Sequence, residues 1–157
     1  MDDRLFRDAM GKFATGVTVI TTEHEGTVHG MTANAFMSVS LSPKLVVVSI
    51  KENARCLDKI KESGAFGVNI LAADQQDLSM IFAGQRKDEE VVAFDALAGA
   101  PVLPGALAQI SCKVSAAHVE GDHTLFIGEV QDIRLEDKEP LLFYAGKYRA
   151  LQTVEVV

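Results

Sequence analysis

Small and hydroxyl-bearing side chains crowd residues 29–41 (HGMTANAFMSVSL), a segment that otherwise has the character of a β-strand. Ser38 and Ser40 are two residues apart, so both point to the same side if the chain is extended. Ser49 and Lys51 repeat this spacing at the end of the apolar run that follows. Hydroxyl and ammonium groups bind phosphate, and small side chains let a flat molecule approach. The spacing therefore predicts a cradle for a flat or phosphorylated ligand.

Arg55 is the third component of this candidate cradle. It lies in the first turn of a predicted helix, where free N–H groups and a partial positive charge attract an anion. The three pieces could converge on one phosphate. The alternative is that Ser38 and Ser40 are turn residues before Pro43, while Lys51 and Arg55 are solvated surface charges. Taken by themselves, these residues favour the alternative.

Several common chemistries lack their motifs in this sequence. No GxGxxG, GxxxxGK[ST], HExxH or GxSxG pattern is present, so Rossmann and P-loop nucleotide binding are not predicted. Cys56 and Cys112 stand in no metal-ligand or disulfide spacing, and we expect them to pack as small hydrophobic side chains in a reducing cytoplasm. No metal site is expected, because the histidines are scattered along the chain: His24, His29, His118 and His123.

The composition indicates one globular domain over residues 1–157, with 48% hydrophobic residues. The net charge of -7, from 15 Lys and Arg against 22 Asp and Glu, would repel a phosphate backbone, so we expect no nucleic acid partner. No apolar run approaches the roughly 20 residues of a membrane span, and the N-terminus lacks the basic region of a signal peptide. We therefore expect no membrane partner and a cytoplasmic location.

Two helices flank the first half of the predicted strands. Asp2 or Asp3 can cap an N-terminal helix that ends at Gly11 and is expected to cover one end of a sheet. Asn53 is predicted to cap a second helix over residues 54–63, which Gly64 is expected to end. These positions leave most of the chain to β-structure.

The strand pattern indicates an antiparallel β-protein. Residues 45–50 form a continuous apolar run, which predicts a central strand buried on both faces. Six or more strands with few intervening helices favour a small antiparallel barrel. Segments with the character of strands are 17–22, 27–32, 66–71, 108–119, 124–135 and 141–144, with a helix expected over 75–82 and an exposed charged loop over 85–90. Glu25 and Gly26 predict a hairpin between the first two of these strands, and the turn residues 120–123 predict another between 108–119 and 124–135.

Nearly the whole chain resembles the short-chain flavin reductase family. Its pattern is similar to that of the small reductase components of two-component phenol and 4-hydroxyphenylacetate hydroxylases. This resemblance implies a mainly β fold, a six-stranded antiparallel split β-barrel with Greek-key topology and a few short flanking helices, usually a homodimer. The segments that carry it are residues 13–21 (FATGVTVIT), 29–36 (HGMTANAF), 38–41 (SVSL), 121–123 (GDH) and 139–142 (EPLL).

The resemblance also implies a flavin site and a nicotinamide site. The isoalloxazine ring would lie against Thr32, Ala33 and Asn34, whose backbone and side-chain donors face its polar edge. The ribityl chain, the phosphate and the outer part of the flavin nucleotide would be bound by Ser38, Val39 and Ser40, by Ser49, Lys51 and Arg55, and by Phe82, Ala83 and Gly84. The nicotinamide nucleotide would be oriented by the catalytic residue His123, beside Tyr144 and Tyr148.

The activity that follows from the resemblance is hydride transfer from NADH or NADPH to FAD or FMN, with FAD favoured. The protein would then supply stacking geometry and charge stabilisation rather than a nucleophile. No basic cluster for a 2′-phosphate stands out, which favours NADH. The resemblance further implies a flavin-dependent oxygenase as recipient of the reduced flavin. Three alternatives remain: a non-enzymatic flavin carrier or sensor, a split-barrel FMN oxidase, and an interaction domain without a cofactor.

Overall fold

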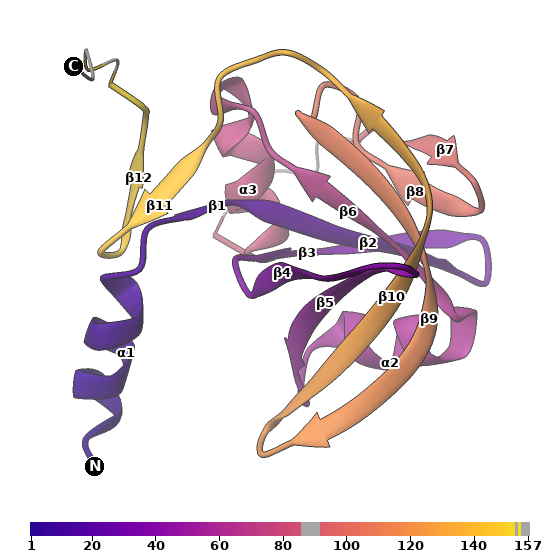
Figure 1. Ribbon diagram of the computed structural model, residues 1–157, viewed down its shortest axis with the longest axis horizontal. Helices are drawn as coiled ribbons and strands as arrows, with labels where there is room; N and C mark the ends of the chain where they lie inside the picture. The colour runs from indigo at the N-terminus through magenta and orange to yellow at the C-terminus, as the bar shows by residue number, and fades with distance from the viewer. Residues whose placement is uncertain (86–91, 153, 155–157) are drawn as a thin grey trace.

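The computed structural model describes residues 1–85, 92–152 and 154. Figure 1 shows a strongly curved antiparallel sheet with short helices around it, so the prediction of a mainly β fold with few helices is confirmed. The sheet has the strand order β3-β2-β6-β9-β10-β5-β4. Its strands, in chain order, are β2 (Thr18–His24), β3 (Thr27–Ala33), β4 (Phe36–Leu41), β5 (Lys44–Lys51), β6 (Ala65–Ile70), β9 (Ala108–Glu120) and β10 (His123–Leu135).

The expected six-stranded barrel is wrong in two respects. The sheet has seven strands, and within the described ranges its edge strands β3 and β4 are not paired with each other, so the barrel is not closed. The extra strand is β4. The sequence shows no boundary between this strand and the preceding segment that forms β3. No glycine or proline separates Ala33 from Phe36, and the change of direction is made by Asn34 and Ala35.

The predicted hairpins are confirmed. Glu25 and Gly26, between β2 and β3, have φ values of 51° and 78°, the paired positive φ values of a tight hairpin turn. Gly121 has a φ of 59° in the turn between β9 and β10. The conformational preferences of the turn residues themselves therefore determine these two connections.

Smaller elements complete the chain. Two short sheets lie beside the large one: β7 (Asp95–Leu97) pairs with β8 (Ala100–Val102), and β1 (Thr15–Gly16), β11 (Leu142–Tyr144) and β12 (Lys147–Arg149) form the order β1-β11-β12. The helices are α1 (Asp3–Gly11), α2 (Arg55–Ser63) and α3 (Gln76–Phe82), the last preceded by a 3-10 turn at Ala73–Gln75. The helix expected over 75–82 is thus confirmed, whereas most of the loop expected over 85–90 lies outside the described residues.

The main core lies between the concave face of the large sheet and α2. It is built from alternate strand residues such as Ile20, Val48 and Phe126, and from Leu57 and Ile60 of the helix. The prediction that residues 45–50 form a central strand buried on both faces is wrong. β5 is second from the sheet edge, and its residues alternate between buried and half-buried because only one face meets the core.

The second helix begins one residue later than predicted, so the cap expected at Asn53 is wrong. Ala54 occupies the N-cap position and makes no side-chain cap hydrogen bond. A turn closed by the Ala54 N–H donating to the Lys51 carbonyl, at 3.0 Å, places Asn53 too early to cap. Gly64 ends the helix with a φ of 71°.

The N-terminal helix has the predicted ends but not the predicted place. Asp2 caps α1 by accepting a hydrogen bond from the Arg4 N–H at 3.0 Å, and the helix ends at Gly11. It does not cover the sheet: none of its residues is buried, and Figure 1 shows it projecting away from the body. The chain that follows α1 enters β1, which pairs with β11 outside the large sheet. The apolar face of α1 is therefore left open.

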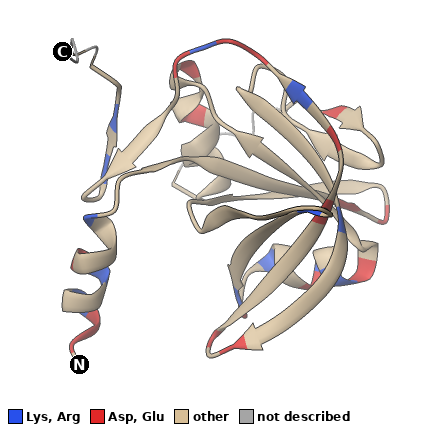
Figure 2. Cartoon of the chain, viewed as in Figure 1, with Lys and Arg blue, Asp and Glu red and all other residues tan. Residues whose placement is uncertain are grey.

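Charged side chains of both signs are interspersed over the helices and loops, while most of the strand surface in Figure 2 carries neither. In the described part of the chain, no helix is both long and apolar enough to cross a membrane. Any positive charge offered to a ligand must therefore come from a few particular residues rather than from a basic face.

Candidate functional site

A small cleft of about 200 Å³ lies where the end of β3 meets α3 and the β11–β12 hairpin. It brings together five of the predicted flavin and nicotinamide residues: Thr32, Ala33, Asn34, Ala83 and Tyr148. It also contains four residues that the sequence analysis did not select: Val17, Ser79, Gln85 and Phe143. Ser79 has no distinguishing signal in the sequence, since a serine among helix residues looks like an ordinary surface position.

Close packing of α3 on β3 forms one wall of this cleft. A Cβ on Gly30 would lie 2.7 Å from the Phe82 ring, so only glycine lets the helix approach so closely. Phe82 also packs against Phe94 at a centroid distance of 6.1 Å. Phe82 is therefore mainly a packing residue that positions the end of α3.

The hydroxyl of Thr32 is already engaged inside the protein. It donates to the Ser79 carbonyl at 2.6 Å, so it offers a ligand only acceptor lone pairs, whereas the sequence analysis expected a side-chain donor. Asn34 is exposed, and its side-chain amide has no hydrogen-bond partner among the described residues. Asn34 is therefore the side-chain donor available at this end of β3.

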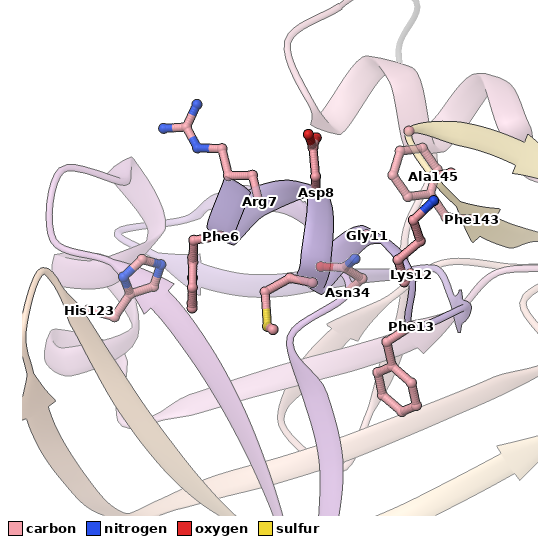
Figure 3. A pocket seen from close by; sticks show the side chains of 12 residues that line it. Phe6, Arg7, Asp8, Gly11, Lys12, Phe13, Asn34, His123, Phe143 and Ala145 are labelled. Atoms are coloured by element: carbon pink, nitrogen blue, oxygen red, sulfur yellow. The ribbon is translucent and has the colours of Figure 1, made fainter. Parts of the chain in front are cut away.

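A larger cleft of about 830 Å³ lies between α1 and the ends of the large sheet and of the β11–β12 hairpin. Figure 3 shows Phe6 of α1 beside His123, Asn34 further along under the helix, and Phe143 close to Ala145 of the β11–β12 turn. Asn34 and Phe143 line both clefts. The two clefts are therefore contiguous, and together they offer adjacent sites for two ligands.

His123 is held by its neighbour in the turn between β9 and β10. Its Nδ1 lies 2.8 Å from Asp122 Oδ1, and the hydrogen bond from His123, together with the charges of His123 and Lys51, lowers the pKa of the Asp122 carboxyl below its usual value. Lys51 is the cross-strand partner of His123. Because Nδ1 is engaged, the other ring nitrogen, Nε2, is left for a ligand in the larger cleft.

The two serines of the predicted cradle do not point to the same side, so that expectation is wrong. A β-bulge at Val39 makes Ser38 pair with Val46 and Ser40 with Leu45, adjacent residues on opposite faces of β5. The bulge arises from strand pairing, which the spacing of two serines does not reveal.

The remaining cradle residues cluster at the far end of β5. Ser49 and Lys51 share one face, as predicted, and Arg55 opens α2 shortly afterwards. Ser40 lies opposite Leu45, six residues before Lys51, a separation of about 20 Å at the rise of a strand. The hydroxyls of β4 and the cations near α2 therefore cannot meet on a single phosphate.

Two other predicted residues lie outside both clefts. Gly84, just after α3, is exposed with a φ of 74°. Tyr144 stacks its ring on the Arg149 guanidinium, 5.6 Å from the ring centroid, and lines neither cleft. Of the two hairpin tyrosines, Tyr148 is the one that lines the small cleft.

Comparison with known families decides how this pair of clefts is to be interpreted. Residues 10–152 match the model described as "Flavin reductase like domain". This chain belongs to that family. The resemblance stated from the sequence motifs is thereby confirmed.

Relatives of this flavin reductase-like protein cover almost its whole length. It is 49% identical to an NADH-dependent flavin reductase from Rhodococcus sp, over 93% of this chain and 85% of the relative. It is 37% identical to the 4-hydroxyphenylacetate 3-monooxygenase reductase component of Thermus thermophilus, over 93% of this chain and 95% of the relative. The solved structure of flavin reductase PheA2 in its native state is 63% identical, with a TM-score of 0.96, and covers 98% of this chain and 100% of that chain.

The residues of the small cleft fit a flavin. Ala33 and Ala83 provide short side chains where a planar ring needs room, and Asn34 provides a free amide for a polar edge. Thr15 adds a buried hydroxyl oxygen with no hydrogen-bond partner among the described residues. Thr15 pairs across the strand with Phe143, which lines both clefts. A flavin reductase-like domain thus carries unused polar groups at this position.

Proposed function

We propose that this chain is an NADH-dependent flavin reductase that delivers reduced FAD or FMN to a flavin-dependent oxygenase. The observation that carries the proposal is the meeting of two clefts at Asn34, one shaped for a flat ring and the other reaching His123. Family membership supports it, and so do relatives that are named as NADH-dependent reductases and as monooxygenase reductase components.

The nicotinamide and the flavin supply the hydride chemistry. The chain supplies position: the ends of β3 and α3 form the walls for the flavin ring, and Asn34 donates a hydrogen bond to its polar edge. His123, oriented by Asp122, holds the nicotinamide nucleotide in the larger cleft. No nucleophile is needed, which agrees with the missing hydrolase motifs.

The outer parts of the flavin nucleotide extend away from the small cleft. We assign Ser38 and Val39 to the ribityl chain and Ser49, Lys51 and Arg55 to the phosphate, because Val46, the strand partner of Ser38, is three residues from Ser49, about 10 Å along β5. Ser40, about 20 Å from Lys51, lies too far away to bind the chain that carries this phosphate, so we do not assign it. We assign Gly84 to the outer part of the nucleotide. Tyr144 lines neither cleft, so we assign it to neither nucleotide.

The deciding experiment is the visible spectrum of the purified protein with FAD or FMN under anaerobic conditions. We expect a near-stoichiometric amount of NADH to bleach the flavin bands. Flavin retained through a desalting column would identify a prosthetic group rather than a cycling substrate. A flavin spectrum that NADH leaves unchanged would contradict the proposal and favour a carrier or an FMN oxidase, and no flavin binding would favour an interaction domain.

Replacing His123 by alanine is expected to raise the KM for NADH about tenfold, because one hydrogen bond to the bound nucleotide is lost. The dissociation constant for flavin should stay within twofold, since His123 lines the larger cleft and not the smaller one. Steady-state kinetics with varied NADH checks this. An unchanged KM would remove His123 from the nicotinamide site.

We propose that the protein is a homodimer in which α1 packs against the second copy. Leu5, Phe6 and Met10 are each more than half exposed, and Phe13 after the helix is 78% exposed. A helix of nine residues with no buried side chain is not stable alone in water, so this apolar face needs a partner. Burying each such side chain contributes about 1.5–3 kcal/mol.

Light scattering checks the oligomeric state. We expect the wild-type protein to have twice the mass of the chain, and the Phe6→Glu, Phe13→Glu double variant to shift toward the monomer. Arg4→Glu, a charge change on the same helix, is the matched control and should remain dimeric. A wild-type monomer would contradict the proposed dimer.

A reducing compartment such as the cytoplasm suits the two cysteines. Burial raises the pKa of the Cys56 thiol to about 11 and that of Cys112 to about 12. Both thiols are free and remain protonated at neutral pH, so they are unreactive packing residues. We propose a cytoplasmic location, because neither cysteine forms a disulfide.

A further inference from the structure

Ser79 is a buried point of contact between two walls of the small cleft. The residue is fully buried, and its hydroxyl lies 2.7 Å from the Tyr148 hydroxyl. Its backbone carbonyl accepts hydrogen bonds from Thr32 Oγ1, at 2.6 Å, and from the Ala83 N–H, at 3.0 Å. Ser79 thus connects the end of β3, the last turn of α3 and the C-terminal hairpin.

Tyr148 is the contribution of the hairpin to this connection. It belongs to β12, the edge strand of the small sheet β1-β11-β12, which is separate from the large sheet. Its ring packs edge-on against Phe143 at a centroid distance of 5.4 Å, and its hydroxyl reaches α3 through Ser79. Backbone hydrogen bonds hold β11, which pairs with β1 and follows the Leu141 N–H that donates to the Leu71 carbonyl at 3.1 Å. Among the described residues β12 pairs only with β11, so the Tyr148 hydroxyl adds a direct link from this strand to α3.

We propose that the Tyr148 hydroxyl is a positioning group that holds the β11–β12 hairpin against α3 and sets the width of the flavin cleft. The inference rests on the proposed function. Tyr148 lines the small cleft and not the larger one, so it acts on flavin affinity rather than on the nicotinamide nucleotide. Its hydroxyl is engaged with Ser79 and takes no part in the reaction.

Tyr148→Phe tests the proposal, because it keeps the ring against Phe143 and removes only the hydroxyl. We expect the dissociation constant for FAD, measured by the change in flavin fluorescence on binding, to rise about tenfold, equivalent to about 1.4 kcal/mol. The value of kcat at saturating flavin should be unchanged. Ser79→Ala should raise the dissociation constant for FAD by a similar factor. The double variant should bind FAD no more weakly than the single variant with the higher dissociation constant, because both substitutions remove the same hydrogen bond.

Tyr144→Phe is the matched control, because Tyr144 lies on the same hairpin but makes no contact with Ser79; its FAD affinity should equal that of the wild type. Unchanged FAD affinity in Tyr148→Phe overturns the proposal. A lower melting temperature with unchanged FAD affinity also overturns it, since that result shows a purely structural role. A wild-type protein that binds no flavin would overturn the proposed function, and this inference with it.

Discussion

Replacing Asn69 by alanine is expected to lower the free energy of unfolding by about 2–4 kcal/mol. Asn69 is fully buried in β6, and its amide makes three hydrogen bonds. It donates to the Val19 carbonyl at 2.9 Å and to the Thr21 hydroxyl at 3.1 Å, and it accepts from the Leu103 N–H at 2.7 Å. Alanine leaves these partners buried without a replacement, and the Leu103 N–H loses its acceptor.

Urea denaturation monitored by circular dichroism measures this effect as a lower midpoint at unchanged slope. Asn53→Ala is the matched control, because Asn53 is exposed in the turn before α2 and should change stability by less than about 0.5 kcal/mol. Equal midpoints for the two variants would show that water replaces the Asn69 hydrogen bonds at little cost. The loss expected for Asn69 is large against a total stability of about 5–15 kcal/mol for a typical domain.

Replacing Ala83 by tryptophan is expected to raise the dissociation constant for flavin at least about 100-fold. The isoalloxazine ring would be displaced and would lose its contacts with all the side chains of the cleft at once. Ala83 is exposed at the end of α3 and lines the small cleft of about 200 Å³. An indole ring there would occupy the space that the proposal gives to the isoalloxazine ring. NADH oxidation should fall in proportion, since it requires bound flavin.

Ala96→Trp makes the same change at an exposed position of the β7–β8 hairpin, away from both clefts. It should bind flavin as the wild type does. Flavin titration of both variants, with the melting temperature as a check on folding, gives the comparison. A folded Ala83→Trp protein that binds flavin normally would place the ring elsewhere.

The sequence was sufficient to predict features that adjacent residues determine. The β2–β3 turn at Glu25 and Gly26 and the helix stop at Gly64 depend on local conformational preference, and both were predicted. The bulge at Val39 and the position of α1 were not. Each depends on which distant strand a segment pairs with, and this pairing cannot be inferred from the local sequence.

The candidate site divides in the same way. Thr32 and Asn34 stand in a recognisable motif, and the structure brings both to the small cleft. Ser79 was missed because its importance comes from burial and from two tertiary contacts, with Thr32 and with Tyr148. A serine in a short helix does not indicate, from the sequence alone, that a strand and a hairpin will contact it.

The unpaired edges of β3 and β4 have a consequence for ligand selectivity. In a closed barrel the main-chain N–H and C=O groups at the outer edge of β3 would form hydrogen bonds with β4. Here, in the described part of the chain, no strand pairs with this outer edge, which ends next to Asn34, where the two clefts meet. The Asn34 carbonyl accepts from the Phe36 N–H at 3.0 Å, so the groups open to a ligand are the other unpaired main-chain groups of the edge. A substitution changes a side chain and leaves the main-chain N–H and C=O groups in place. This edge can therefore bind the polar edge of a ligand whatever side chains surround it.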